Sequence, residues 1–175
     1  MSFATLYGSG VDFSAIFTPP TPGDYNYGQE PDFAPGTIMF GSDGSAFVYV
    51  SFGTGGSDGA GYVCLIDPTD YSAVMVTTSN DAFGAPVGVA QGEAAANDYG
   101  WLQVLGPCQV FGVASALANN PVAATATDGV VDDAGAAGTL YIDGMIFTTA
   151  VGSGGNALAA AYLNWPVFST VPATA

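Results

Sequence analysis

The stretch YGWLQVLGPCQVFGVASAL, residues 99–117, contains two apolar segments on either side of a Leu105-Gly106-Pro107 break. The segments WLQV and CQVFGVA predict two β-strands, and Gly with Pro between them predicts a connection. Side chains alternate along a strand, so we expect Trp101 and Val104 to face opposite sides. Nothing in the stretch indicates catalysis, and its pattern is that of a structural scaffold.

Short apolar segments of the same kind recur on both sides of this stretch. Turn sequences such as SDG, and the glycine loop GTGGSDGAG, separate them. Only ALAAAYL, residues 157–163, has the composition of a helix, but Gly and Pro flank it, and LAAAYLNWPVFS is apolar enough for a buried last strand. About ten short strands at regular spacing predict an all-β fold, a small barrel or sandwich of short antiparallel strands. We assign this domain to residues 36–175.

Residues 1–35 differ from the rest of the chain. The segment FTPPTPGDYNYGQEPDFAPG places prolines and tyrosines around Gly and Asp, without a sustained period. Proline favours extended geometry and removes a ladder donor. We therefore predict an extended N-terminal arm that is ordered by contact with another surface; a long surface loop of the same domain is the alternative.

The charge excludes several function classes. The 175 residues hold 15 acids and no Lys, Arg or His, which gives a net charge of −15. Such a chain has no side chain to neutralise phosphates, and its field repels nucleic acid and anionic lipid. It also lacks the lysine of a Schiff base and the histidine of ordinary acid–base catalysis. We predict that the protein is not an enzyme and binds neither nucleic acid nor membrane.

Motifs for metals and cofactors are weak. The Asp-Gly segments GSDGS, TGGSDGAG and TDGVVDD have oxygen ligands that suit Ca²⁺, but none fits the EF-hand spacing, and solvated turns explain them equally well. Glu30 and Glu93 have no identifiable carboxylate partner for glycoside hydrolysis. We predict no catalytic residues, no metal and no cofactor.

The cysteines and the termini bear on where the protein is made. Cys64 and Cys108 lie in apolar strand-like segments, which predicts buried reduced thiols, with a disulfide as the alternative. The first residues, MSFATLYGSGVDF, do not resemble a secretory signal, and no run of about 18 apolar residues predicts a membrane span. We expect synthesis in a cytoplasm.

Residues 87–117, VGVAQGEAAANDYGWLQVLGPCQVFGVASAL, resemble a recurrent family of tailed-bacteriophage virion proteins that includes capsid decoration, or cement, proteins. The resemblance extends upstream through GTIMFGSDGSAFVYV and downstream through ATDGVVD, YIDGMIF and LNWPVF, covering about residues 36–168. It depends mostly on Gly, Ala and aromatic positions. Members of the family commonly carry some Arg and Lys, whereas this chain supplies only carboxylates to any ion pair.

The resemblance implies a structural protein of the virion that binds the outer surface of a phage head and stabilises it. Its partners would be the major capsid protein and itself, as a homotrimer at threefold positions. The alternative is a tail or spike module that binds a host glycan through Trp101 or Trp165. The residues expected at interfaces are the apolar arm residues and two aromatics of the opening stretch, namely Phe3, Leu6, Tyr7, Phe13, Ile16, Phe17, Tyr99 and Trp101.

Overall fold

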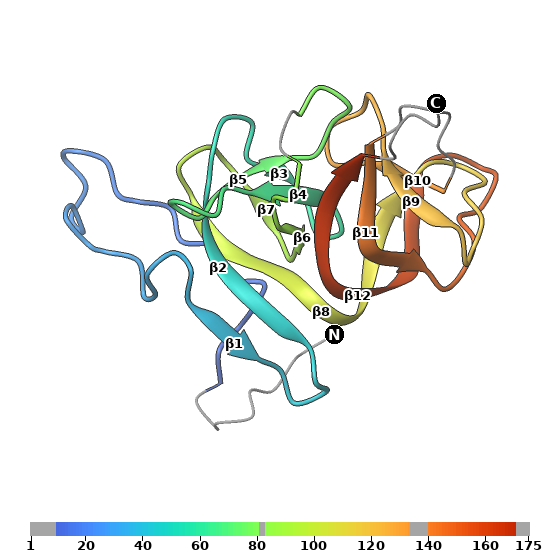
Figure 1. Cartoon of the computed structure of the whole chain (residues 1–175). Helices are drawn as coiled ribbons and strands as arrows, with labels where there is room; N and C mark the ends of the chain where they lie inside the picture. The colour runs from blue at the N-terminus through green and yellow to red at the C-terminus, as the bar shows by residue number, and fades with distance from the viewer. Residues whose placement is uncertain (1–9, 81–82, 134–139, 171–175) are drawn as a thin grey trace.

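The computed structural model describes residues 10–80, 83–133 and 140–170, and these residues form strands joined by turns and loops (Figure 1). Within these ranges no helix is long and apolar enough to cross a membrane. The strands are β1 (Ile38–Phe40), β2 (Ala46–Phe52), β3 (Ser57–Asp58), β4 (Val63–Ile66), β5 (Ser72–Met75), β6 (Val87–Ala90), β7 (Glu93–Ala94), β8 (Tyr99–Gly112), β9 (Pro121–Ala124), β10 (Val131–Asp132), β11 (Leu140–Phe147) and β12 (Ala157–Thr170).

The main sheet closes on itself twice. Strands β2, β5, β4, β6 and β8 pair in a ring that returns to β2, which we call the first barrel. Strands β8, β10, β9, β11 and β12 pair in a second ring that returns to β8, the second barrel. Figure 1 shows the two barrels side by side, with β8 running from one to the other. The prediction of an all-β, barrel-like fold is confirmed.

Strand β8 changes partners at its centre. Its first half pairs with β2 and its second half with β12, and Leu105 is in register with both Ala46 of β2 and Asn164 of β12. Gly106, with φ of 93°, follows directly, and a side chain there would collide with Ser45. The prediction of two strands around a connection is therefore wrong: the Leu105-Gly106-Pro107 break is a bend within a single 14-residue strand.

Each barrel has its own apolar core, and the two cores meet at a shared wall. Leu102 and Val104 of β8 point into the first barrel, and Cys108 and Val110 point into the second. Strands β4 and β6 are buried along their whole length, because their alternate side chains enter the two cores. A strand buried on both faces is a continuous apolar run, as VCLI is.

Residues 157–163, which have the composition of a helix, form the start of the last strand, β12. Ala159, Ala161 and Leu163 of β12 are buried while Leu158 and Tyr162 are exposed, a period of two. Trp165 has a positive φ of 48° where β12 bends, opposite the irregularity at Gly144 of β11. Most pairings are antiparallel, but β2 with β5 and β8 with β10 are parallel.

Candidate functional site

The base of the predicted arm packs on the outside of the first barrel. Phe13 stacks on Phe47 with ring centroids 3.9 Å apart and meets Trp101 edge to face at 5.2 Å. Phe33, at the other end of the arm, contacts Trp101 at 5.0 Å and Tyr49 at 5.5 Å. Trp101 is consequently only 2% exposed, although its side chain points away from the core of the barrel.

Residues 15–17 extend the sheet along the start of β8. The Phe17 N–H donates to the Tyr99 carbonyl oxygen and the Tyr99 N–H donates back to the Phe17 carbonyl oxygen, both at 2.8 Å. Ile16 lies over Gly100, where an added Cβ would come within 2.6 Å of the Ile16 side chain. The glycine at position 100 thus leaves room for the arm to lie flat on β8.

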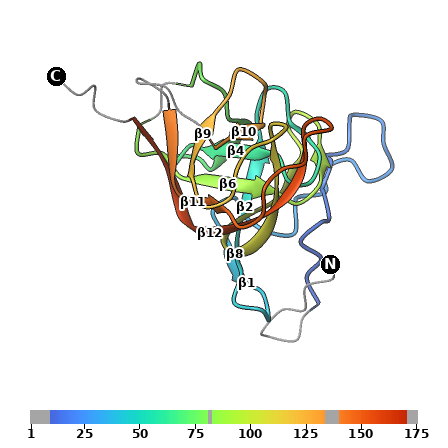
Figure 2. The ribbon, with the colours of Figure 1, turned by 90° about the vertical axis from the view of Figure 1, so that its right-hand side faces the viewer.

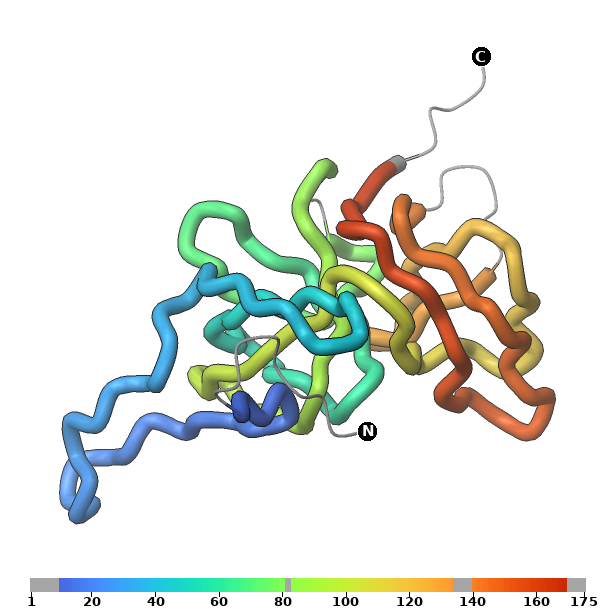
Figure 3. The backbone as a smooth tube through the Cα atoms, turned by 90° about the horizontal axis from the view of Figure 1, so that it is seen from below, coloured from blue at the N-terminus to red at the C-terminus, as the bar shows by residue number. Residues whose placement is uncertain are grey.

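Between these two attachment points the chain leaves the body of the molecule. Residues 18–32 form a loop that projects from the first barrel in two perpendicular views (Figures 1 and 3). Tyr25 is fully exposed and Tyr27 is 64% exposed. The loop also carries Asp24, Glu30 and Asp32. We call residues 18–32 the projecting loop.

The structure brings together five of the eight residues predicted at interfaces. Within one molecule, Phe13 contacts Trp101 and Phe17 contacts Tyr99. Ile16 lies over Gly100, between Tyr99 and Trp101 on β8. Phe3, Leu6 and Tyr7 lie outside the described residues. Any role of the eight in contacts between molecules stays a prediction, but the structure adds an intramolecular role that the sequence reasoning missed.

Burial also changes the chemistry of Tyr49 in this aromatic cluster. Desolvation, with smaller contributions from the charge of Asp32 and from Tyr99, raises the pKa of the Tyr49 phenol to about 12. Tyr49 therefore stays neutral at physiological pH, as expected of a packing residue. Nothing about it indicates an acid or a base in catalysis.

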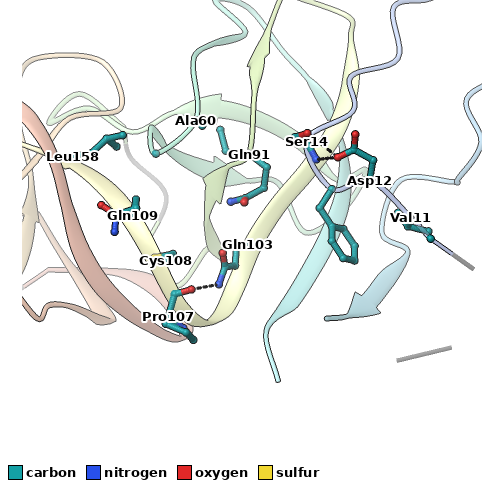
Figure 4. A pocket seen from close by; sticks show the side chains of 14 residues that line it. Val11, Asp12, Ser14, Ala60, Gln91, Gln103, Pro107, Cys108, Gln109 and Leu158 are labelled. Atoms are coloured by element: carbon teal, nitrogen blue, oxygen red, sulfur yellow. Dashed lines mark hydrogen bonds between the residues drawn. The ribbon is translucent and has the colours of Figure 1, made fainter. Parts of the chain in front are cut away.

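A cleft of about 740 Å³ separates the arm base from the second barrel (Figure 4). Asp12 and Ser14 lie on one side, and Leu158 and Gln109 lie on the other. Asp12 accepts hydrogen bonds from the Ser14 backbone and hydroxyl, which lower the pKa of its carboxyl below the usual value. The cleft is otherwise lined by neutral groups, with Gln91 and Gln103 on its floor.

Gln103 is the buried polar group of this cleft, with 1% of its surface exposed. Its Nε2 donates to the carbonyl oxygens of Pro107 at 2.9 Å and Leu105 at 3.0 Å, and lies 3.3 Å from the Ser45 hydroxyl. These bonds fix the bend of β8, because they satisfy carbonyls on both sides of Gly106. All three use the nitrogen, so among the described residues no donor reaches Oε1, which can accept from a hydroxyl or amide entering the cleft.

The described part of the chain also contains the acidic segments and the two cysteines noted in the sequence. There, no three His, Cys, Asp or Glu side chains gather as metal ligands. The Asp-Gly segments of the sequence form turns and short strands: Asp43 accepts from the Ser45 N–H at 3.0 Å, whereas Asp58 lies in β3 and Asp132 in β10. Cys64 and Cys108 are free and buried, which confirms reduced thiols over a disulfide, and burial raises the pKa of each thiol to about 12.

Comparison with known proteins adds no relative to this picture. No protein-family model matches the chain, and no curated protein matches it. A functional assignment therefore depends on the charge, the fold and the surfaces of the molecule itself.

Proposed function

We propose that this protein is a structural component of a bacteriophage virion, a decoration protein that binds the outer surface of the head and stabilises it. The observation that carries the proposal is the projecting loop, which leaves the double barrel and exposes two tyrosines to solvent. Both ends of the loop are held on Trp101, by Phe13 and Phe33. A loop fixed at its base can reach a neighbouring protein at a small entropic cost.

The charge agrees with an outer position. A molecule of charge −15 is repelled by packaged DNA and is attracted by a shell surface that offers Lys or Arg. Asp24, Glu30 and Asp32 place carboxylates beside Tyr25 and Tyr27 on the same loop. Aromatic anchors with a polar surround are the composition of protein interfaces. The partner is accordingly the major capsid protein, and this binding role requires no catalytic residues.

The proposal is tested on heads that lack the protein. Purified protein is added, bound copies are counted by electron microscopy, and release of DNA on heating is measured. Tyr25→Ala with Tyr27→Ala should keep the melting temperature of the free protein and weaken binding to heads. Phe83→Ala, which truncates an exposed aromatic elsewhere, is the matched control and should bind normally. Wild-type protein that neither binds heads nor delays DNA release would refute the proposal.

A glycan-binding tail or spike module is the second candidate, and the cleft favours it. Gln91, Gln103 and Gln109 present amides, and the free acceptor Oε1 of Gln103 suits a sugar hydroxyl. Trp101 is covered by Phe13 and Phe33 and offers no open ring face, whereas Trp165 is 45% exposed. A glycan array with wild type and Gln103→Leu tests this candidate, which requires binding by the first and loss by the second.

A further inference from the structure

The two halves of the outer face of β8 differ in whether other residues cover them. In its first half, Trp101 and Gln103 point outward and the arm base covers Trp101. In its second half, Pro107 and Gln109 point outward and are exposed, because the described part of the arm, which begins at Gly10, does not extend that far. Phe111, the next outward residue, stacks on Tyr62 at 4.9 Å. Among the described residues, the chain therefore covers this strand face at Trp101 and at Phe111 and leaves Pro107 and Gln109 between them exposed.

The uncovered half belongs to a wider apolar surface on the second barrel. Tyr162 of β12 is in register with Pro107 of β8 and with Ile146 of β11, and Leu158 is in register with Phe111. Tyr162 and Leu158 are 47% and 48% exposed. Figure 2 views the molecule from the side of the second barrel, where β8, β12 and β11 run next to one another. We call this surface the open face; its residues are Pro107, Gln109, Ile146, Leu158, Ala160 and Tyr162.

The open face is set apart by its charge. Residues 99–127 and 144–175 contain no Asp or Glu, so β8 and β12 bring no acid to it. The one acid of β11 is Asp143, which lies beyond the Gly144 irregularity and pairs with Val167. Next to Ile146, Pro121 of β9 follows Asn120, whose side-chain amide holds the Asp133 carboxylate at 2.8 Å. Asp12 lies on the other side of the cleft from Gln109 and Leu158. Acids therefore border the open face, and none of its own residues is an acid.

We infer that the open face is the surface on which copies of this chain associate with one another. A molecule with 15 acids and no cationic side chain cannot form side-chain ion pairs with a copy of itself, so contacts between acidic surfaces are repulsive. Association needs an apolar surface free of acids, and the open face meets that requirement. The acidic surfaces remain for a partner that supplies cations.

This inference names the self-association surface of the proposed decoration protein. It is tested on purified protein without capsids, so that a failure to bind heads does not affect the result. Sedimentation velocity over a range of concentrations measures association of the full chain. Added NaCl should strengthen it, because salt screens the repulsion between the remaining acids and leaves the apolar contact intact. Association that weakens with salt, or a wild-type monomer at every concentration, overturns the inference.

A single added charge gives the sharpest comparison. Gln109→Glu keeps the size of the side chain and places a carboxylate on the open face, next to Ala160 of β12, where it should weaken association about tenfold or more. Asn97→Asp makes the same amide-to-carboxylate change in an exposed turn before β8, outside the open face and the projecting loop, and should leave association unchanged. Equal association of the two variants overturns the inference.

A second pair of variants changes the apolar contact itself. Tyr162→Asp on the open face should yield monomers, whereas Phe40→Asp, on β1 at the edge of the sheet, removes an aromatic ring of the same exposure, 47%, and should associate like wild type. Circular dichroism of each variant establishes that it is folded, and Gln109→Glu remains decisive if Tyr162→Asp unfolds. Loss of association in Phe40→Asp, with Tyr162→Asp unaffected, would assign the interface to β1 instead.

Discussion

Phe13 and Trp101, far apart in the sequence, meet edge to face with ring centroids 5.2 Å apart and planes at 87°. Edge-to-face aromatic pairs add about 0.5–1.5 kcal/mol beyond the area they bury. The pair joins the arm base to the strand that both barrels share. Removal of either ring should therefore lower the free energy of unfolding.

Replacement of Trp101 by Ala should lower the free energy of unfolding by about 3–5 kcal/mol, because it leaves a cavity between the arm and β8. Chemical denaturation followed by circular dichroism measures the loss. Trp165→Ala is the control, since Trp165 is 45% exposed and its removal opens no internal cavity. An unchanged midpoint for Trp101→Ala would assign the residue to recognition and not to the scaffold.

Replacement of Phe13 by Ala should uncover Trp101. In a Trp165→Phe background, the fluorescence of Trp101 should shift to the red, and stability should fall by about 3 kcal/mol. Tyr25→Ala on the projecting loop should change neither. Deletion of residues 2–30 removes Phe13 as well and should lower the melting temperature. A truncated protein as stable as the full chain would show that the arm contributes nothing to the fold.

Salt should stabilise the isolated protein. The 15 acids repel one another, and the repulsion is screened over about 10 Å at 0.1 M salt. The melting temperature should rise with NaCl and rise somewhat more with Mg²⁺ at equal ionic strength. A large, saturable and stoichiometric rise with Ca²⁺ that Mg²⁺ does not reproduce would instead establish a calcium site.

The adjacent acids Asp132 and Asp133 should respond to pH in opposite ways. Desolvation, and the neighbouring Asp133 charge to a smaller extent, raise the pKa of Asp132, whereas the hydrogen bond from Asn120 lowers that of Asp133. A raised carboxyl pKa means that the folded state favours the protonated form. The contribution of Asp132 to the free energy of unfolding is therefore full at low pH and is lost as pH rises through the raised pKa. A lowered pKa, as for Asp133, stabilises the folded state at pH values above the pKa of the unfolded chain, and this stabilisation is lost as pH falls through the lowered pKa.

Asn substitutions separate these two effects. Asp132→Asn should raise the melting temperature at pH 7, and the gain should vanish below pH 3.8, the ordinary value, where the wild-type carboxyl is protonated. Asp133→Asn should lower it at pH 7, because the substituted amide loses the charge that Asn120 binds. Melting curves at pH 7 and at acidic pH measure both, and equal effects of the two variants would contradict the assignment.

The two cysteines should be unreactive in the native protein. Cys64 is fully buried and Cys108 is 8% exposed, with both thiols protonated at pH 8 because burial raises their pKa to about 12. A thiol reagent should label neither quickly in buffer and both in guanidinium. Cys108 lines the cleft and should react before Cys64. Mass spectrometry of partly labelled protein reports the order, and prior labelling of Cys64 would contradict the burial.

Many of the strands could be predicted from the sequence, but the closure of the sheet into two rings could not. Alternation and turn residues predict strands such as AFVYVSF and YIDGMIF, because these signals are local. The Leu105-Gly106-Pro107 break was misjudged because Gly and Pro also mark bends, and only the exchange of partners from Ala46 to Asn164 distinguishes a bend from a connection. Two closed rings depend on such long-range pairings, which no local window contains.

The arm shows the same limit for the candidate site. Phe13, Ile16 and Phe17 have no partner in their own segment, which is why the sequence predicts contact with an external surface. Their partners are Phe47, Gly100 and Tyr99, on strands that follow much later in the chain. The cleft was also missed, since Gln91, Gln103 and Gln109 have no motif and become neighbours only through the bend of β8.

Because β8 belongs to both closed rings, it determines how the molecule unfolds. Without β8, each barrel is an open sheet with two unpaired edges, so neither can persist while the other unfolds. The double barrel therefore has one cooperative unit, in which the amide protons of β8 exchange with solvent only through global unfolding. On a phage head, the position that we propose for it, such a protein would hold its shape up to a single threshold and would not soften in stages.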